Sequence, residues 1–231
     1  MRIIATVIAL FAAVQISAAQ GKVVLEGTLD VEDGFVDIWK HEYECRRDST
    51  DFIATVEVRD GRFWIECDAP DALVCRVYRK DYPGWCPVFL EPGQFTSQVG
   101  ERNRDLVFTG GRNQQVFNEF LGHYMAAWRK YKSLLAEYDN NQDRHFDKIR
   151  PRANVILGEL ISSLDGFFHK YADRDVSAYV LYMLSFGADI GTPNPRDLKE
   201  MYNALAPGPK NTPYGKRVAA TIRKMETGQL Q

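Results

Sequence analysis

The chain has 231 residues, of which 45% are hydrophobic and 26% are charged. These proportions are ordinary for a globular protein and exclude a mainly disordered chain. The formal net charge is −2 at pH 7, and acidic and basic residues are interspersed without a basic stripe. This charge pattern argues against nucleic acid or an anionic membrane surface as a partner.

The N-terminal segment, residues 1–19, predicts a secretory signal peptide. Arg2 gives a positive start, residues 3–16 form an uncharged and mostly apolar run, and Ser17-Ala18-Ala19 is a small-residue cleavage signal. The alternative is an N-terminal core strand or helix. We expect cleavage after Ala19 and a periplasmic or secreted mature protein. No later apolar run approaches the length of a membrane span, so we expect no transmembrane segment after cleavage.

Residues 20–110 predict an antiparallel β domain. Short apolar runs alternate with turn signals about every ten residues, which is typical of a β-sandwich or barrel of about eight short strands. No helix-length pattern intervenes, which argues against a parallel βαβ sheet and a dinucleotide-binding fold. The expected strands are Val23–Leu29, Phe35–Lys40, Phe52–Val58, Arg62–Cys67, Leu73–Tyr78, Val88–Leu90, Phe95–Val99 and Leu106–Phe108.

Three dipeptides predict tight turns between successive strands: Asp33-Gly34, Asp60-Gly61 and Pro92-Gly93. We interpret each as the turn of a hairpin. Around Asp60-Gly61, the expected pairs are Arg59 with Arg62, Val58 with Phe63, Val56 with Ile65 and Ala54 with Cys67. Glu57 and Trp64 would then share the face of this hairpin opposite the apolar one.

Residues 111–231 predict an all-α domain of about five helices, which makes the fold class α+β. Gly110-Gly111 is the expected turn from the last strand into the first helix, which ends at Asp139. A second helix is expected to begin near Pro151, a third to cover Val176–Phe186, and two more to begin at Asn194-Pro195 and Thr212-Pro213, with a break at Pro207-Gly208-Pro209. The expected buried stripes are Val116, Phe117, Phe120, Leu121, Tyr124, Trp128, Tyr131 and Leu135 in the first helix, and Ala153, Ile156, Leu160, Leu164, Phe167 and Tyr171 after Pro151.

Short stretches in this order resemble a known arrangement. They are Asp60–Phe63, Phe89–Gly93, Phe108–Gly110 leading into Asn113–Phe120, Phe168–Leu184, Leu198–Leu205 and Thr212–Lys216. The chain resembles the N-terminal portion of periplasmic thioredoxin-like thiol–disulfide oxidoreductases of the alkyl-hydroperoxide-reductase/thiol-specific-antioxidant type. In that family, a β-rich domain of unknown function and a helical segment precede a thioredoxin domain with a Trp-Cys-x-x-Cys site. This chain contains no Cys-x-x-Cys, so the resemblance implies the architecture and the compartment but no catalytic residue.

Four cysteines, Cys45, Cys67, Cys75 and Cys86, fall in the β half. Disulfides are reasonable in an oxidising compartment, and four cysteines allow three pairings. We favour Cys67–Cys75, because both residues fall on the core-facing side of strands that we expect to be neighbours, and hence Cys45–Cys86. The alternative is four buried thiols. Trp85-Cys86-Pro87 is similar to half a thioredoxin site but lacks the second thiol that exchange requires.

Other chemistry finds little support in the sequence. The four histidines are scattered, and none stands at metal-ligand spacing from another histidine or a cysteine. No Gly-x-Ser-x-Gly motif or paired-acid arrangement is present. We therefore expect no catalytic residue, no metal and no cofactor.

Aromatic residues are the candidate binding residues: Trp64, Tyr78, Tyr82 and Trp85. An exposed aromatic face on a small sheet can bind a peptide or a glycan. The alternative is that the helical half covers this face. We hypothesise an exported, non-catalytic binding or scaffolding module whose partner is a thioredoxin-like protein or an envelope component. The alternative function is an accessory role in thiol–disulfide exchange, through its own cysteines or a separate thioredoxin-like partner.

Overall fold

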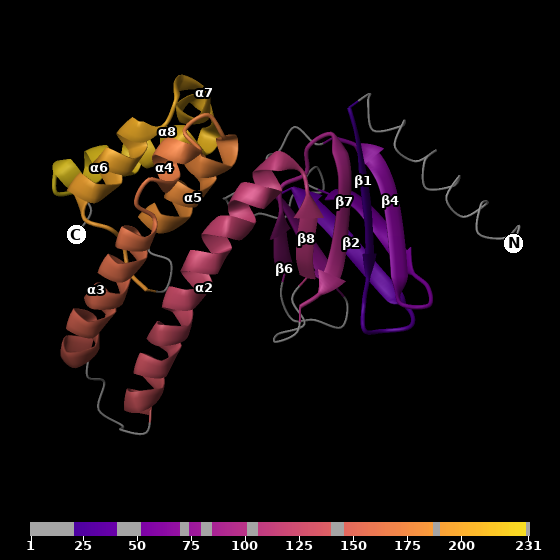
Figure 1. Cartoon of the computed structure of the whole chain (residues 1–231), viewed down its shortest axis with the longest axis horizontal. Coiled ribbons are helices and arrows are strands. Elements are labelled where there is room, and N and C mark those ends of the chain that lie inside the picture. The colour runs from indigo at the N-terminus through magenta and orange to yellow at the C-terminus, as the bar shows by residue number, and fades with distance from the viewer. Residues whose placement is uncertain are drawn as a thin grey trace, which may run out of the picture. The chain divides into compact units, whose positions relative to one another are not determined.

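The computed structural model describes residues 21–40, 52–69, 74–79, 85–100, 106–139, 146–186 and 190–229. The predicted signal peptide, Cys45 and Tyr82 lie outside these ranges. The chain divides into two compact units, Met1–Gln115 and Val116–Gln231. Strands make up the first unit and helices the second (Figure 1), which confirms the α+β class.

The β-rich unit contains two four-stranded sheets within the described residues. The first sheet has the strand order β4-β1-β7-β8 and the second sheet the order β3-β2-β5-β6. All pairs are antiparallel except β1 and β7, which run parallel, so the expectation of a purely antiparallel domain is wrong at this one pair. The strands are β1 (Lys22–Thr28), β2 (Gly34–Lys40), β3 (Phe52–Val58), β4 (Arg62–Asp68), β5 (Cys75–Arg79), β6 (Trp85–Val88), β7 (Gly93–Val99) and β8 (Leu106–Gly110).

The core of this unit lies between the two sheets. Alternate residues are buried along most of the strands, as the sequence pattern predicts, whereas β1 buries Val23, Val24 and Leu25 in succession. Leu25 and Phe95 of the first sheet belong to the same buried cluster as Val36 and Val77 of the second sheet. Two sheets that share one apolar core in this way form a sandwich.

The Asp60-Gly61 turn forms as predicted, but the long hairpin does not. Asp60 and Gly61 have φ of 50° and 68°, and Arg59 and Arg62 exchange two backbone hydrogen bonds of 2.9 Å. Beyond that pair the strands separate, β3 into the second sheet and β4 into the first. The predicted pairs from Val58–Phe63 onward are therefore wrong. Val58 and Phe63 remain buried although their strands separate, because both side chains belong to the core that the two sheets share.

The other two predicted turns also connect the sheets rather than close hairpins. Asp33-Gly34 leads from β1 in the first sheet to β2 in the second, and Pro92-Gly93 leads from β6 in the second sheet to β7 in the first. The consecutive strands that do pair are β2–β3, β5–β6 and β7–β8, and they are joined by residues 41–51, 80–84 and 100–105.

The chain leaves the first sheet through Gly110 and Gly111, whose φ values are 105° and 62°. A Cβ on Gly110 would lie 2.2 Å from the Gln94 carbonyl oxygen, so only glycine fits there. The next helix, α2 (Arg112–Asp139), begins at once. Its N-terminus is capped from a distance: Glu91 Oε1 accepts from the backbone N–H groups of Arg112 and, at 3.0 Å, of Asn113. This carboxylate occupies the place where an anion would bind.

The helical unit contains α2 and six further helices within the described residues. Asn194 Oδ1 accepts from the backbone N–H of Asp197 at 2.9 Å, and Thr212 Oγ1 accepts from that of Gly215 at 3.1 Å, which confirms both predicted caps. Two expectations are wrong: the second helix begins at Phe146, with Pro151 inside it, and Pro207-Gly208-Pro209 opens a short helix instead of a break. The six are α3 (Phe146–Ser163), α4 (Phe167–Lys170), α5 (Asp175–Ser185), α6 (Pro195–Ala204), α7 (Pro207–Asn211) and α8 (Pro213–Glu226). No helix in the described ranges is long and apolar enough to cross a membrane.

Two series of largely buried apolar and aromatic side chains lie in the helical unit, one along α2 and the other along α3 and α4. In each series, successive members are alternately three and four residues apart. This seven-residue repeat is typical of a coiled-coil seam. The predicted stripe is partly wrong: Ala127, Leu134 and Leu157 are buried, whereas Trp128, Leu135 and Ile156 are only half-buried. The series are Phe117, Phe120, Tyr124, Ala127, Tyr131 and Leu134 on α2, and Ala153, Leu157, Leu160, Leu164 and Phe167 on α3 and α4.

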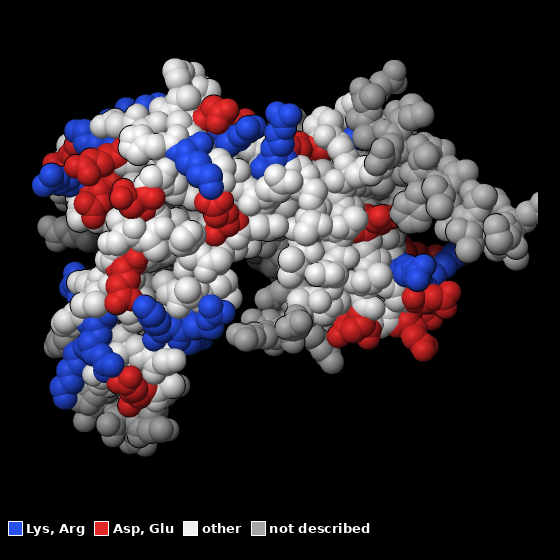
Figure 2. Space-filling model, in the orientation of Figure 1, with Lys and Arg blue, Asp and Glu red and all other residues white. Residues whose placement is uncertain are grey.

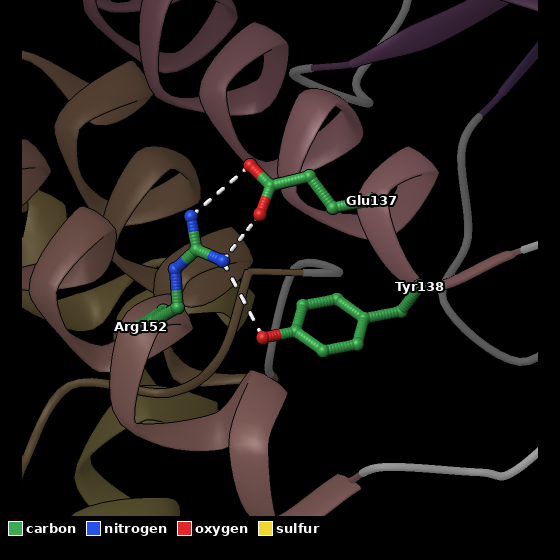
Figure 3. A network of polar contacts seen from close by, with 3 residues as sticks. All are labelled: Glu137, Tyr138 and Arg152. Carbon is green, nitrogen blue, oxygen red and sulfur yellow. Dashed lines mark hydrogen bonds and ion pairs between the residues drawn. The ribbon is translucent and has the colours of Figure 1, made fainter. Parts of the chain in front are cut away.

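Three ion pairs between exposed side chains connect α2 with α3 and α4 in antiparallel order. Glu119 pairs with Lys170, Lys130 with Glu159, and Glu137 with Arg152. From one pair to the next, the residue number rises by eleven and then by seven along α2, and it falls by the same amounts along α4 and α3. In the last pair, Arg152 donates to both carboxylate oxygens of Glu137 and to the Tyr138 hydroxyl (Figure 3).

Candidate ligand-binding site

A hollow of about 490 Å³ opens on the β-rich unit. Its base is formed by three neighbouring strands of the first sheet, β4, β1 and β7, and part of its wall by β3. We call it the Trp64 hollow. Its lining residues are Glu26, Gly27, Thr28, Glu57, Arg59, Arg62, Phe63, Trp64, Thr96 and Ser97.

A straight row of side chains crosses the outer face of the first sheet at this hollow. In the strand register Trp64 lies opposite Glu26, Glu26 opposite Thr96, and Thr96 opposite Thr109. Residues opposite each other project from the same face of a sheet. The two threonine hydroxyls are 2.6 Å apart. Since neighbouring strands are about 4.8 Å apart, the row is about 14 Å long.

Trp64 is the most exposed aromatic side chain among the described residues of the β-rich unit, with 55% of its surface accessible. Within the described part of the chain, its ring contacts no other aromatic ring or cation, and the Glu26 carboxylate and the Arg62 guanidinium form no hydrogen bond or ion pair. An indole face, an acceptor and a donor are therefore all available to a ligand at one place.

The wall of the hollow carries an ion pair. Arg59 Nη2 lies 2.6 Å from Glu57 Oε2, and the two side chains are 77% and 53% exposed. The prediction that Glu57 and Trp64 share one hairpin face is wrong, because β3 and β4 belong to different sheets. Both residues nevertheless line the hollow. With Glu26 and Arg62, the described lining residues include two acidic and two basic side chains. Figure 2 shows the same mixing of the two signs elsewhere, on the face drawn.

The floor of the hollow is closely packed. A Cβ on Gly27 would lie 2.0 Å from Ser97 Oγ and 2.5 Å from the Phe63 ring, so a larger residue would have to displace both. Ser97 is only 6% exposed, and its hydroxyl has no hydrogen-bond partner within the described residues.

The structure separates the aromatic residues that the sequence groups together. Trp64 belongs to the first sheet, whereas Tyr78 lies in the second sheet, opposite Asp37 and Trp85 in the register. The predicted shared face for Trp64 and Tyr78 is therefore wrong, because β4 and β5 belong to different sheets.

Several residues of these surfaces were missed at the level of sequence. Trp39 lies two residues along β2 from Asp37 and forms an edge-to-face contact with Phe52, with ring centroids 5.0 Å apart. Its alternation with the buried Val36 and Ile38 could have indicated this outward position. Glu26 and Thr96 are brought to Trp64 only by the strand register, for which the sequence offers no local signal.

The cysteines do not form the favoured bridge between Cys67 and Cys75. Cys67, Cys75 and Cys86 are all thiols, and Cys67 lies in the first sheet whereas Cys75 lies in the second. Cys75 and Cys86 are buried, and burial raises the pKa of the Cys67 thiol. A thiol with a raised pKa holds little of the reactive thiolate at neutral pH.

No group of three or more potential metal ligands occurs among the residues that the structure describes. His123 lies on α2 and His169 on α4. His41 and His145 lie outside the described ranges.

Comparisons with known proteins leave the chain without a family. No protein-family model matches it, and neither does any curated protein. Among solved structures, it is similar to CBM25-2, a carbohydrate-binding module of the beta/alpha-amylase from Paenibacillus polymyxa. The identity is 12%, the TM-score is 0.28, and the match covers 39% of this chain and 92% of the module. A likeness at this level carries no conclusion about function.

Proposed function

We propose that the β-rich unit is a non-catalytic binding module of an exported protein and that the Trp64 hollow is its ligand site. The observation that carries this proposal is the row across the first sheet, in which an exposed indole lies opposite the Glu26 carboxylate, which has no ion-pair partner within the described residues. Exposed aromatic side chains next to polar groups are typical of binding surfaces.

The residues of the hollow support binding rather than catalysis. Nucleophilic catalysis needs a nucleophile within hydrogen-bond reach of a base. The one serine that lines the hollow, Ser97, is buried and has no such partner within the described residues. No histidine or cysteine is among the described residues that line the hollow.

Thiol–disulfide exchange gains no support from the three cysteines that the structure describes. It requires an accessible thiol with a lowered pKa. Cys75 and Cys86 are buried, and the pKa of Cys67 is raised.

The experiment is an array comparison with the full chain and two variants. The fluorescently labelled protein is applied to printed glycans and to printed peptides. We expect a set of signals for the wild type that Trp64→Ala loses and Phe52→Ala keeps. Phe52 is the matched control, because it is an exposed aromatic residue, 42% accessible, that is not among the described residues lining the hollow. Equal signals for wild type and Trp64→Ala, or no wild-type signal on either array, would overturn the proposal.

A further inference from the structure

The chemistry of the hollow points to one class of ligand, and this step rests on the proposed function. Trp64 presents an apolar, planar surface, and the other described lining residues include hydrogen-bond acceptors and donors. The ligand must therefore combine a flat apolar face with hydrogen-bonding groups at its edge.

The charges of the lining residues narrow the class of ligand further. Glu26 and Glu57 together balance Arg59 and Arg62, and the Glu57–Arg59 pair is already satisfied within the protein. An anion such as a phosphate ester would approach the two carboxylates, and a cation such as an ammonium group would approach the two guanidinium groups. Neither is selected by the described lining residues, whose charges sum to zero.

The two groups that remain available have opposite hydrogen-bonding roles. The Glu26 carboxylate only accepts hydrogen bonds, and the Arg62 guanidinium only donates them. A hydroxyl group can do both, so adjacent hydroxyls on one ring satisfy this pair without any charge on the ligand. Thr28 and Thr96 add hydroxyl groups to the lining of the same hollow.

We infer that the Trp64 hollow binds a neutral glycan, with the C–H face of one pyranose ring stacked on Trp64 and its hydroxyls bonded to Glu26 and Arg62. The row continues from Trp64 across the sheet to Thr109, where the paired threonine hydroxyls lie. A linear chain of more than one sugar ring can follow this row. A peptide could also lie on such a surface. The row, however, contains no group that would bind a peptide better than it binds a hydroxyl-rich ring.

The test is isothermal titration calorimetry of the full chain with four uncharged oligosaccharides: maltohexaose, cellohexaose, xylohexaose and N-acetylchitohexaose. At least one is expected to bind. Trp64→Ala should weaken binding by about tenfold or more, as loss of a central aromatic contact does, while Phe52→Ala leaves it unchanged. Circular dichroism of each variant establishes that it is folded.

Two further measurements separate hydroxyl recognition from charge recognition. Glu26→Gln keeps a carbonyl acceptor and should retain most of the affinity, whereas Glu26→Ala should lose it. Raising the salt to about 0.5 M NaCl should change the dissociation constant by less than about twofold, since no ligand charge is screened.

Each contrary result has a defined meaning. Trp64-dependent binding of a peptide, or of charged glycans alone with a steep salt dependence, overturns the neutral-glycan inference and leaves the proposed binding site standing. Oligosaccharide binding that Trp64→Ala does not weaken overturns both.

Discussion

The cap that Glu91 places on α2 should be worth a measurable part of the stability of the β-rich unit. Its Oε1 accepts from two backbone N–H groups at the helix start, and its Oε2 lies 3.1 Å from Asn113 Nδ2. Loss of a capping side chain costs about 1 kcal/mol, and loss of a negative charge at a helix N-terminus costs about 0.5 kcal/mol more. With the additional bond to the Asn113 side chain, Glu91→Ala should lower the free energy of unfolding by about 2 kcal/mol.

Glu91→Gln separates the two contributions, because it keeps an acceptor oxygen but not the charge. We expect it to lose only about 0.5 kcal/mol. The assay is urea unfolding followed by circular dichroism, in which Glu91→Ala should lower the midpoint by about 1 M. Arg129→Ala, at an exposed position within the same helix, is the control and should stay within about 0.5 kcal/mol of the wild type. If Glu91→Ala behaves like this control, the capping argument is refuted.

Three other sites predict a loss of stability, a gain of stability and a pH-dependent change in stability. The Arg79 side chain is 1% exposed and lies 2.5 Å from Asp30, so Asp30→Asn should cost about 3 kcal/mol in urea unfolding; a loss below about 1 kcal/mol would contradict a buried ion pair. Ser97→Ala removes a buried hydroxyl without a partner within the described residues and should raise the unfolding free energy by about 1 kcal/mol; a destabilised variant would show that the hydroxyl is satisfied. The Tyr171 hydroxyl, helped by a neighbouring lysine, holds the pKa of Glu119 below its ordinary value. That stabilisation is present above the unfolded-state pKa and is lost as the pH falls through the lower folded-state pKa. Tyr171→Phe should therefore raise the Glu119 pKa in a carboxyl NMR titration, and the wild type should lose more stability than the variant between about pH 5 and about pH 3; an unchanged titration would contradict the assignment.

Local chemistry made part of this fold predictable. The caps at Asn194 and Thr212 and the turn at Asp60-Gly61 depend on residues close together in the chain, and all three form as the sequence indicates. The alternation of buried residues along the strands was predictable for the same reason.

Strand partners were not predictable, because a tight turn reverses the chain whether or not the strands pair. Val58 and Phe63 are buried equally well on one hairpin face or on the facing sides of two sheets. The hydrophobic pattern therefore cannot distinguish a hairpin from a crossing between the sheets.

The helical seam shows a related limit. A stripe read at 3.6 residues per turn favours Trp128 and Leu135, whereas the packed helices follow a repeat of seven residues and bury Ala127 and Leu134. Alanine is a weak signal in a hydrophobic pattern, so the sequence alone does not show that Ala127 is buried in preference to Trp128.

The candidate site was predictable only in part. Trp64 could be identified from its place on the polar side of a strand. Glu26 and Thr96 could not, because they come from β1 and β7, a parallel pair whose strands are far apart in the chain. The composition of the site therefore depends on which strands pair and in what register.

The most direct test of the binding site observes Trp64 itself. The chain has four tryptophans, so its ¹⁵N-labelled form should give four indole N–H signals, and Trp64→Phe assigns one of them. During titration with the oligosaccharide that binds in calorimetry, we predict that the Trp64 signal shifts with saturation while that of Trp128, on α2, stays in place. A shift confined to the other tryptophans, with Trp64 unmoved at saturation, would contradict the assignment of the ligand site.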